Sequence, residues 1–149
     1  MTYGYASSEP TLTLNLTPEQ RKAGRDLARL LGLAQTRGPT AGEGSLSKLI
    51  TAIAQHAADT NPRNTASRLA WTKSIAPATR WKSHTMVMIA DTLIPQLIAV
   101  AKYAGHTRHT GQADRIGQGS ANALIASIAQ HAHDYGPDVT ARKLKWLVN

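Results

Sequence analysis

An internal repeat constrains this chain more than any other feature of its sequence. Residues 42–59, GEGSLSKLITAIAQHAAD, return 75 residues later as residues 117–134, GQGSANALIASIAQHAHD, with 11 of the 18 positions identical. The same offset continues in Pro62 and Pro137, Thr65 and Thr140, Leu69 and Leu144, and Trp71 and Trp146. Two copies are too few for a solenoid, in which three or more repeats stack. The repeat therefore predicts one domain made of two similar halves.

The length and composition suit such a domain. The 149 residues are enough for one ordinary core, whereas a single half would be marginal alone. The absence of Cys excludes disulfides and cysteine-ligated zinc. Residues 1–10 lack the basic and apolar regions of a secretory signal, and no apolar run approaches the length of a membrane span. We therefore expect a cytoplasmic protein without a membrane partner, and a flexible tail over residues 1–10.

The charge favours a polyanionic partner. The net charge is +8 and the pI is about 10.2. Residues 1–75 carry nine basic and five acidic side chains, and residues 76–149 carry eight and four, so each half contributes +4. Nucleic acid is the first candidate for such a chain. The segment 63–82, with five basic and no acidic residues around Trp81, is a second place where it could bind.

The first copy begins with a predicted strand and continues with helices. Residues 11–16 alternate polar and apolar, which predicts a strand with one buried face. Thr17, Pro18 and Gln20 form a capping-box pattern that starts a helix. A second helix begins at Ser45, a good N-cap, and residues 64–75 predict a third, shorter helix with Leu69 and Trp71 buried. The expected buried positions of the first helix are Ala23, Leu27, Leu30, Leu31 and Ala34.

The second copy repeats this order with different side chains. Aligning Gly105 with Gly32 gives an offset of 73, which places a second strand at residues 84–89. In this register Val87 and Ile89 point inward, whereas a shift by one residue would bury the methionines instead. The following helix is mostly apolar and lacks the arginine row at positions 21, 25 and 29. The loop before the next helix is two residues longer than in the first copy.

The duplicated pattern resembles the ribbon-helix-helix proteins, the MetJ/Arc repressor superfamily. The residues that carry the resemblance are LxLTPE at 14–19, LARxxG at 27–32 and GSxSxLI at 44–50, with VxIAD at 87–91, LxxVAKxxG at 97–105 and GSxxxLI at 119–125. The chain is similar to tandem members from conjugative DNA-transfer systems, in which one polypeptide forms a complete pseudo-dimer. The resemblance implies a mainly α fold with one two-stranded antiparallel ribbon, in which strand 11–16 pairs with strand 84–89. It also implies halves at 11–75 and 84–149, joined by a linker at 76–83 and sharing one core.

The resemblance further implies that the chain binds double-stranded DNA with its ribbon in the major groove, which is wide enough for two strands. The positions that would read bases are Thr11, Thr13 and Asn15 on one strand and His84, Met86 and Met88 on the other. Methionine cannot donate or accept a strong hydrogen bond at a base edge. Contact with thymine methyl groups is the role that Met86 and Met88 could take, unless the second strand reads no bases.

The N-termini of the second helices would hold DNA phosphates, because their N–H groups and dipoles attract anions. The implied phosphate-binding residues are Gly44, Ser45, Lys48, Gly119 and Ser120, with Arg21 and Arg25 on the first helix. We expect the loop glycines to let the backbone approach a phosphate closely.

Other interpretations are weaker. The arginine row is by default a solvated helix face. His56 and His131 lie near helix ends, where the dipole would favour imidazolium. His106, His109, His131 and His133 could assemble a metal site, but no carboxylates stand at ligand spacing, so we expect neither metal nor cofactor.

No catalytic arrangement stands out either, so an enzyme is not expected. The roles that fit are a transcriptional repressor, or an accessory factor for DNA transfer or plasmid maintenance that contacts a DNA-processing enzyme or a second copy of itself. The alternative is a protein-interaction module that kept the fold and lost DNA binding.

Overall fold

The computed structural model describes residues 11–36, 38–39, 41–73, 75, 84–107 and 119–148. The predicted tail 1–10 and linker 76–83 lie outside these residues. The elements follow one another as β1 (Thr11–Asn15), α1 (Pro18–Leu30), α2 (Leu46–Asp59), α3 (Pro62–Arg68), β2 (His84–Met88), η2 (Asp91–Leu93), α4 (Ile94–Tyr103), α5 (Ala121–Tyr135), α6 (Pro137–Lys143) and η4 (Lys145–Leu147). The described chain is therefore mainly helical with one two-stranded sheet, and the order strand, helix, helix, short helix occurs twice.

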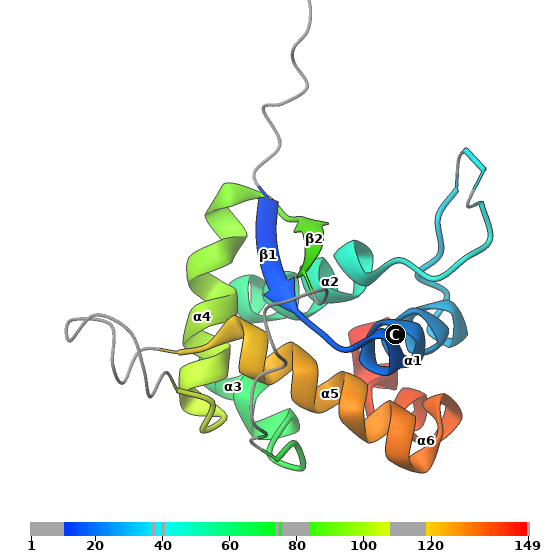
Figure 1. Cartoon of the computed structure of the whole chain (residues 1–149). Coiled ribbons are helices and arrows are strands. Elements are labelled where there is room, and N and C mark those ends of the chain that lie inside the picture. Colours follow the sequence, from blue (N-terminus) through cyan, green and yellow to red (C-terminus); the bar gives the residue numbers. More distant parts are fainter. Residues whose placement is uncertain are drawn as a thin grey trace, which may run out of the picture.

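The two strands form one antiparallel ribbon at one end of the molecule (Figure 1). Thr11 lies opposite Met88 and Asn15 lies opposite His84, so the predicted pairing within one chain is confirmed. Leu14 and Val87 are each about 1% exposed and face the helices. The predicted register, with Val87 and Ile89 inside, is therefore correct as well.

The helices of the two halves pack on one another across the molecule. Helix α1 packs mainly on α5 and α6, whereas α4 packs on α2 and α3 (Figure 1). The buried apolar side chains of both halves form a single core cluster. This arrangement explains why α4 is mostly apolar, because α2, α3 and α5 all contact it.

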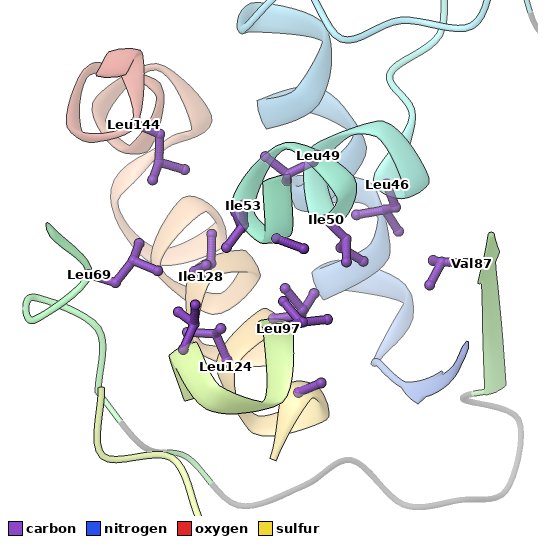
Figure 2. Packing of buried hydrophobic residues seen from close by; sticks show 14 of the residues in the cluster. Leu46, Leu49, Ile50, Ile53, Leu69, Val87, Leu97, Leu124, Ile128 and Leu144 are labelled. Atoms are coloured by element: carbon purple, nitrogen blue, oxygen red, sulfur yellow. The ribbon is translucent and has the colours of Figure 1, made fainter. Parts of the chain in front are cut away.

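Helix α2 lies at the centre of this core (Figure 2). Its apolar stripe is buried as predicted, and it consists of Leu46, Leu49, Ile50, Ile53, Ala54 and Ala57. Figure 2 shows Leu97 of α4, Ile128 of α5 and Val87 of β2 directed toward it. Each half thus supplies apolar side chains that complete the other half's core.

The local start signals of the first copy are confirmed. The Thr17 hydroxyl accepts from Gln20 N–H at 3.0 Å, and the Gln20 side chain accepts from Thr17 N–H at 2.9 Å. Helix α3 begins at Pro62 after the Asn61 cap, earlier than predicted, but it ends at Arg68 instead of residue 75, so it is shorter than predicted. Leu69 is buried behind it, as expected, but Trp71 is only half-buried.

Two predicted core positions of the first helix are wrong. Ala34 lies beyond the end of α1 and is half-buried. Leu30 was expected inside, but its side chain is 47% exposed. The buried face of α1 runs through Ala23, Gly24, Leu27 and Ala28. At about 100° per residue, position 30 turns away from the centre of that face. None of the described helices has the length and apolarity that a membrane crossing requires.

Candidate nucleic-acid interface

The pairing register gathers the six candidate base-reading residues on one face of the ribbon. Cross-strand partners point to the same side of a sheet. The outer face is made of three such pairs, Thr11 with Met88, Thr13 with Met86, and Asn15 with His84. Five of these six residues are exposed and Asn15 is half-buried. Met86 and Met88 are 67% and 51% exposed. The ribbon therefore presents one continuous exposed surface.

Asn15 is less accessible than the other five residues. It is the last residue of β1, it is half-buried, and its side-chain oxygen is buried without a hydrogen-bond partner among the described residues. Its backbone N–H donates to Asn122 Oδ1 at 2.6 Å, and its carbonyl accepts from Asn122 Nδ2 at 3.2 Å. Thr13, at the centre of the strand and exposed, is the better placed base-reading candidate.

Asn122 and Ser47 are structural residues that the sequence reasoning missed. Ser47 Oγ accepts from Met88 N–H at 2.9 Å, which repeats the contact of Asn122 with Asn15 at the other end of the ribbon. Helices α2 and α5 thus each hold the strand of the opposite half. In the sequence, both are polar residues two positions after an N-cap serine. This pattern did not reveal their role, because the strand residue that each one binds lies 107 residues away for Asn122 and 41 residues away for Ser47.

Both predicted N-caps are formed. Ser45 Oγ accepts from Lys48 N–H, and Ser120 Oγ accepts from Ala123 N–H, at 3.1 Å in each case. The N-terminal ends of α2 and α5 therefore carry the positive partial charge of an ordered helix start. Lys48 itself donates from Nζ to the Ala34 carbonyl at 2.8 Å, so its ammonium secures the loop before α2.

Two of the loop glycines have a packing role. Gly44 and Gly119 are buried, and a Cβ on them would overlap the backbone carbonyls of Arg25 and Ile98. These glycines let each loop lie against the preceding helix. Packing therefore requires glycine at both positions, and the phosphate contact expected there stays a prediction.

A groove joins the N-terminus of α2 to the ribbon. It has a volume of about 360 Å³. Its lining includes Arg25, the residues at the start of α2 (45–47) and strand residues 85–87, with the carboxylate of Glu43 also present. An adjoining hollow of about 230 Å³ is lined by Lys22, Arg25 and Arg29. Arg25 lines both hollows and so connects the ribbon to the rest of the arginine row, in which Arg21 is half-buried.

Two histidine clusters lie among the helices. His56 Nδ1 is 2.7 Å from Thr65 Oγ1, and its ring meets the edge of Trp146 at 4.7 Å between centroids. His131 repeats this with Thr140 at 2.6 Å and Trp71 at 4.8 Å. In each cluster the tryptophan comes from the other half. Packing between the halves is therefore the role of Trp71 and Trp146.

These histidines do not carry the charge that their helix ends suggested. Burial lowers the pKa of His56 below 6.5, and the cation of Arg68 lowers it further. Burial also lowers the pKa of His131, followed by the effect of Lys143. The expectation of imidazolium at both positions is therefore wrong at neutral pH.

The histidines do not assemble a metal site within the described part of the chain. No group of three or more His, Cys, Asp or Glu side chains is close enough there to hold an ion. His106 is buried and lies with Nε2 2.8 Å from Thr72 Oγ1, while His109 falls outside the described residues, as does Trp81.

Comparisons with protein-family models, with curated proteins and with solved structures find no match to this chain. The function is therefore argued from the geometry of the ribbon and its surroundings.

Proposed function

We propose that this chain binds double-stranded DNA with the β1–β2 ribbon in the major groove, as a ribbon-helix-helix pseudo-dimer formed by one polypeptide. The observation that carries the proposal is the exposed outer face of the ribbon, on which Thr11, Thr13 and His84 offer hydrogen-bonding groups beside Met86 and Met88. A two-stranded ribbon fits the major groove, where base edges and thymine methyl groups are accessible.

The surroundings of the ribbon support an anionic partner. Arg25 and the N-terminus of α2 line the same groove as strand residues 85–87. Arg29 and Lys22 extend the row of cations along α1, where Lys22 is paired with Asp26 at 3.1 Å. Phosphates beside a major-groove ribbon would meet cations and a helix dipole here, and such contacts supply much of the affinity of DNA-binding proteins.

The biological role that we propose requires DNA binding but no catalysis. We assign the protein no enzymatic activity and no cofactor, and we place it in the cytoplasm. It would mark a DNA-processing or transfer site for a partner enzyme, or repress transcription from an operator. The tandem arrangement favours the first role only by analogy with conjugative DNA-transfer accessory proteins.

A gel-shift titration against random genomic fragments at several salt concentrations tests the proposal. The parent should show a steep loss of affinity with salt. Replacing Arg25 and Arg29 together with Ala should reduce the slope of log K against log salt by about 2, since each phosphate contact contributes about 1. The matched control replaces the exposed Arg142 and Lys145 with Ala, which removes the same charge and should leave the slope unchanged.

One observation favours a second function. Met86 and Met88 are large, apolar and exposed, as on a surface that binds another protein. The apolar helix α4, by contrast, needs no partner, because other helices of the chain contact it. If the parent and the Arg142/Lys145 control both lack salt-dependent DNA affinity, the interaction module replaces the DNA-binding proposal. If the parent binds DNA and the Arg25/Arg29 variant keeps the parent's salt slope, segment 63–82 becomes the candidate surface.

A further inference from the structure

The two halves have matching backbones around the ribbon but different side chains. Leu33 N–H donates to Ala28 O, and His106 N–H donates to Ala101 O, both at 2.8 Å and 73 residues apart in the chain. The pairing of Thr13 with Met86, which are also 73 apart, lies at the centre of the ribbon. The ribbon is therefore close to two-fold symmetric in its backbone.

The outer face breaks that symmetry at every position. Thr11 is equivalent to His84, Thr13 to Met86 and Asn15 to Met88. One strand thus offers hydroxyl and amide groups, whereas its partner offers an imidazole and two thioethers. Hydroxyl and amide groups can hydrogen-bond base edges, but thioethers suit apolar thymine methyl groups. The two strands cannot prefer the same bases.

The flanking helices break the symmetry in charge. On α1 the exposed or half-exposed cations are Arg21, Lys22, Arg25 and Arg29. The equivalent positions near and on α4 hold Ile94, Pro95, Ile98 and Lys102. Glu19 and Asp26 also lie on α1, and Lys22 is paired with Asp26 at 3.1 Å. Residues 18–30 therefore carry a net charge of +2, and the equivalent residues 91–103 carry a net charge of 0. A DNA backbone placed along this ribbon would be held more strongly beside α1 than beside α4.

From these differences we infer that the chain recognises a non-palindromic DNA site and binds it in one orientation. This inference rests on the proposed function. Arg25 and residues 85–87 line one groove, so the half-site beside α1 and β2 provides most of the phosphate contacts and the thymine methyl contacts to Met86 and Met88. The half-site beside β1 provides the hydrogen-bonded bases. A bound copy would thus give the DNA site a direction, which a symmetric dimer cannot do.

The first experiment selects preferred duplexes from a random pool with the full chain. We expect a site whose two halves differ. Joining two copies of the left half, or two copies of the right half, should give palindromes that bind about tenfold or more weakly than the selected site, since each mismatched pair costs affinity. Selection of a palindrome would overturn the inference and leave DNA binding intact. Failure to enrich any duplex, together with no gel shift, would instead remove the proposed function.

Hydroxyl-radical footprinting of the selected duplex tests the phosphate asymmetry separately. Protection should be stronger on the half-site beside α1. Arg29→Ala should weaken protection of that half, and its matched variant Lys102→Ala should weaken only the other half. Equal protection of both halves in the parent would contradict the inference.

A face-swap variant tests the base preference. His84→Thr, Met86→Thr and Met88→Asn together copy the β1 face onto β2 at exposed positions, so the fold should persist, which circular dichroism would verify. The selected site should then become palindromic in its bases, while the footprint stays stronger beside α1. A folded variant that still selects the parent's asymmetric site would show that these side chains do not read the DNA.

Discussion

At the scale of single residues, Gly44 and Gly119 are required by close packing of backbone on backbone. A Cβ at Gly44 would overlap the Arg25 carbonyl, which is part of α1 and cannot move alone. We expect Gly44→Ala to lower the free energy of unfolding by about 1–3 kcal/mol through overpacking. Urea denaturation would measure this loss.

Gly24→Ala is the matched control for that variant. A Cβ there meets only the end of the Leu46 side chain, at 2.7 Å, and that side chain can shift. Alanine also favours the helix, so the net change should be smaller. Equal losses at Gly24 and Gly44 would contradict the packing explanation.

His106 should make the fold sensitive to acid. Its Nε2 lies 2.8 Å from Thr72 Oγ1, and that hydroxyl donates to the Leu69 carbonyl, so the imidazole donates from Nε2. Burial lowers the pKa of His106 from 6.5. Below pH 6.5 the unfolded chain binds a proton at His106 more readily than the folded chain does. The free energy of unfolding therefore falls as the pH falls, until the pH passes the lower pKa that His106 has in the folded chain. Above pH 6.5 the histidine is neutral in both states and stability is level.

The measurement compares thermal unfolding at about pH 7.5 and about pH 5, where the two protonation states differ. The parent should lose stability at the lower pH. His106→Leu, which copies Leu33 at the equivalent position, should lose less, and His56 and His131 should account for what remains. An identical pH dependence in the parent and His106→Leu would assign the effect elsewhere.

At the scale of elements, the ends of the strands depend on helices of the opposite half. Asn122 of α5 bonds both the N–H and the carbonyl of Asn15, and Ser47 of α2 bonds the N–H of Met88. Asn122→Ala leaves two half-buried backbone groups without this partner. We expect it to destabilise the fold by about 1–3 kcal/mol.

Asn122→Ser is the matched variant, because serine occupies the equivalent position in the first half. Its hydroxyl can accept from the Asn15 N–H but cannot replace the amide that donates to the Asn15 carbonyl. Denaturant titrations should therefore place its stability between those of the parent and Asn122→Ala. The prediction fails if serine and alanine are equally destabilising.

At the scale of the whole molecule, neither half contains a complete core. Helix α1 packs mainly on α5 and α6, α4 packs on α2, and β1 pairs with β2. A chain of residues 1–75 alone would expose the faces that the second half covers. We expect it to be unfolded or self-associated, and we expect mixing with residues 76–149 to restore helical structure.

Circular dichroism and size-exclusion chromatography of the two fragments, separately and mixed, would check this expectation, with the full chain as reference. A monomeric fragment 1–75 that unfolds cooperatively would contradict it. Such a result would mean that each half is a domain of its own.

The sequence by itself determined the local elements and the symmetry of the chain. Four signals predicted the strands and the helix starts correctly: the alternation at 11–16, the capping box at Thr17, the serine N-caps and the 73-residue offset. Each depends on neighbouring residues or on the repeat. The pairing of the two strands was implied by the resemblance to ribbon-helix-helix proteins, and it is also correct. The six ribbon positions were also found this way, since side chains in paired strands alternate between two faces.

Only the tertiary structure decided how these positions are used. In the folded chain, the backbone of Asn15 hydrogen-bonds Asn122, 107 residues away. The Lys48 ammonium donates to a loop carbonyl, and Gly44 and Gly119 pack against helix backbones. The tertiary structure also turned Leu30 outward and removed the charge expected on His56. These outcomes depend on contacts between segments that are distant in the chain. A local sequence pattern does not show which distant residue will lie beside a given side chain.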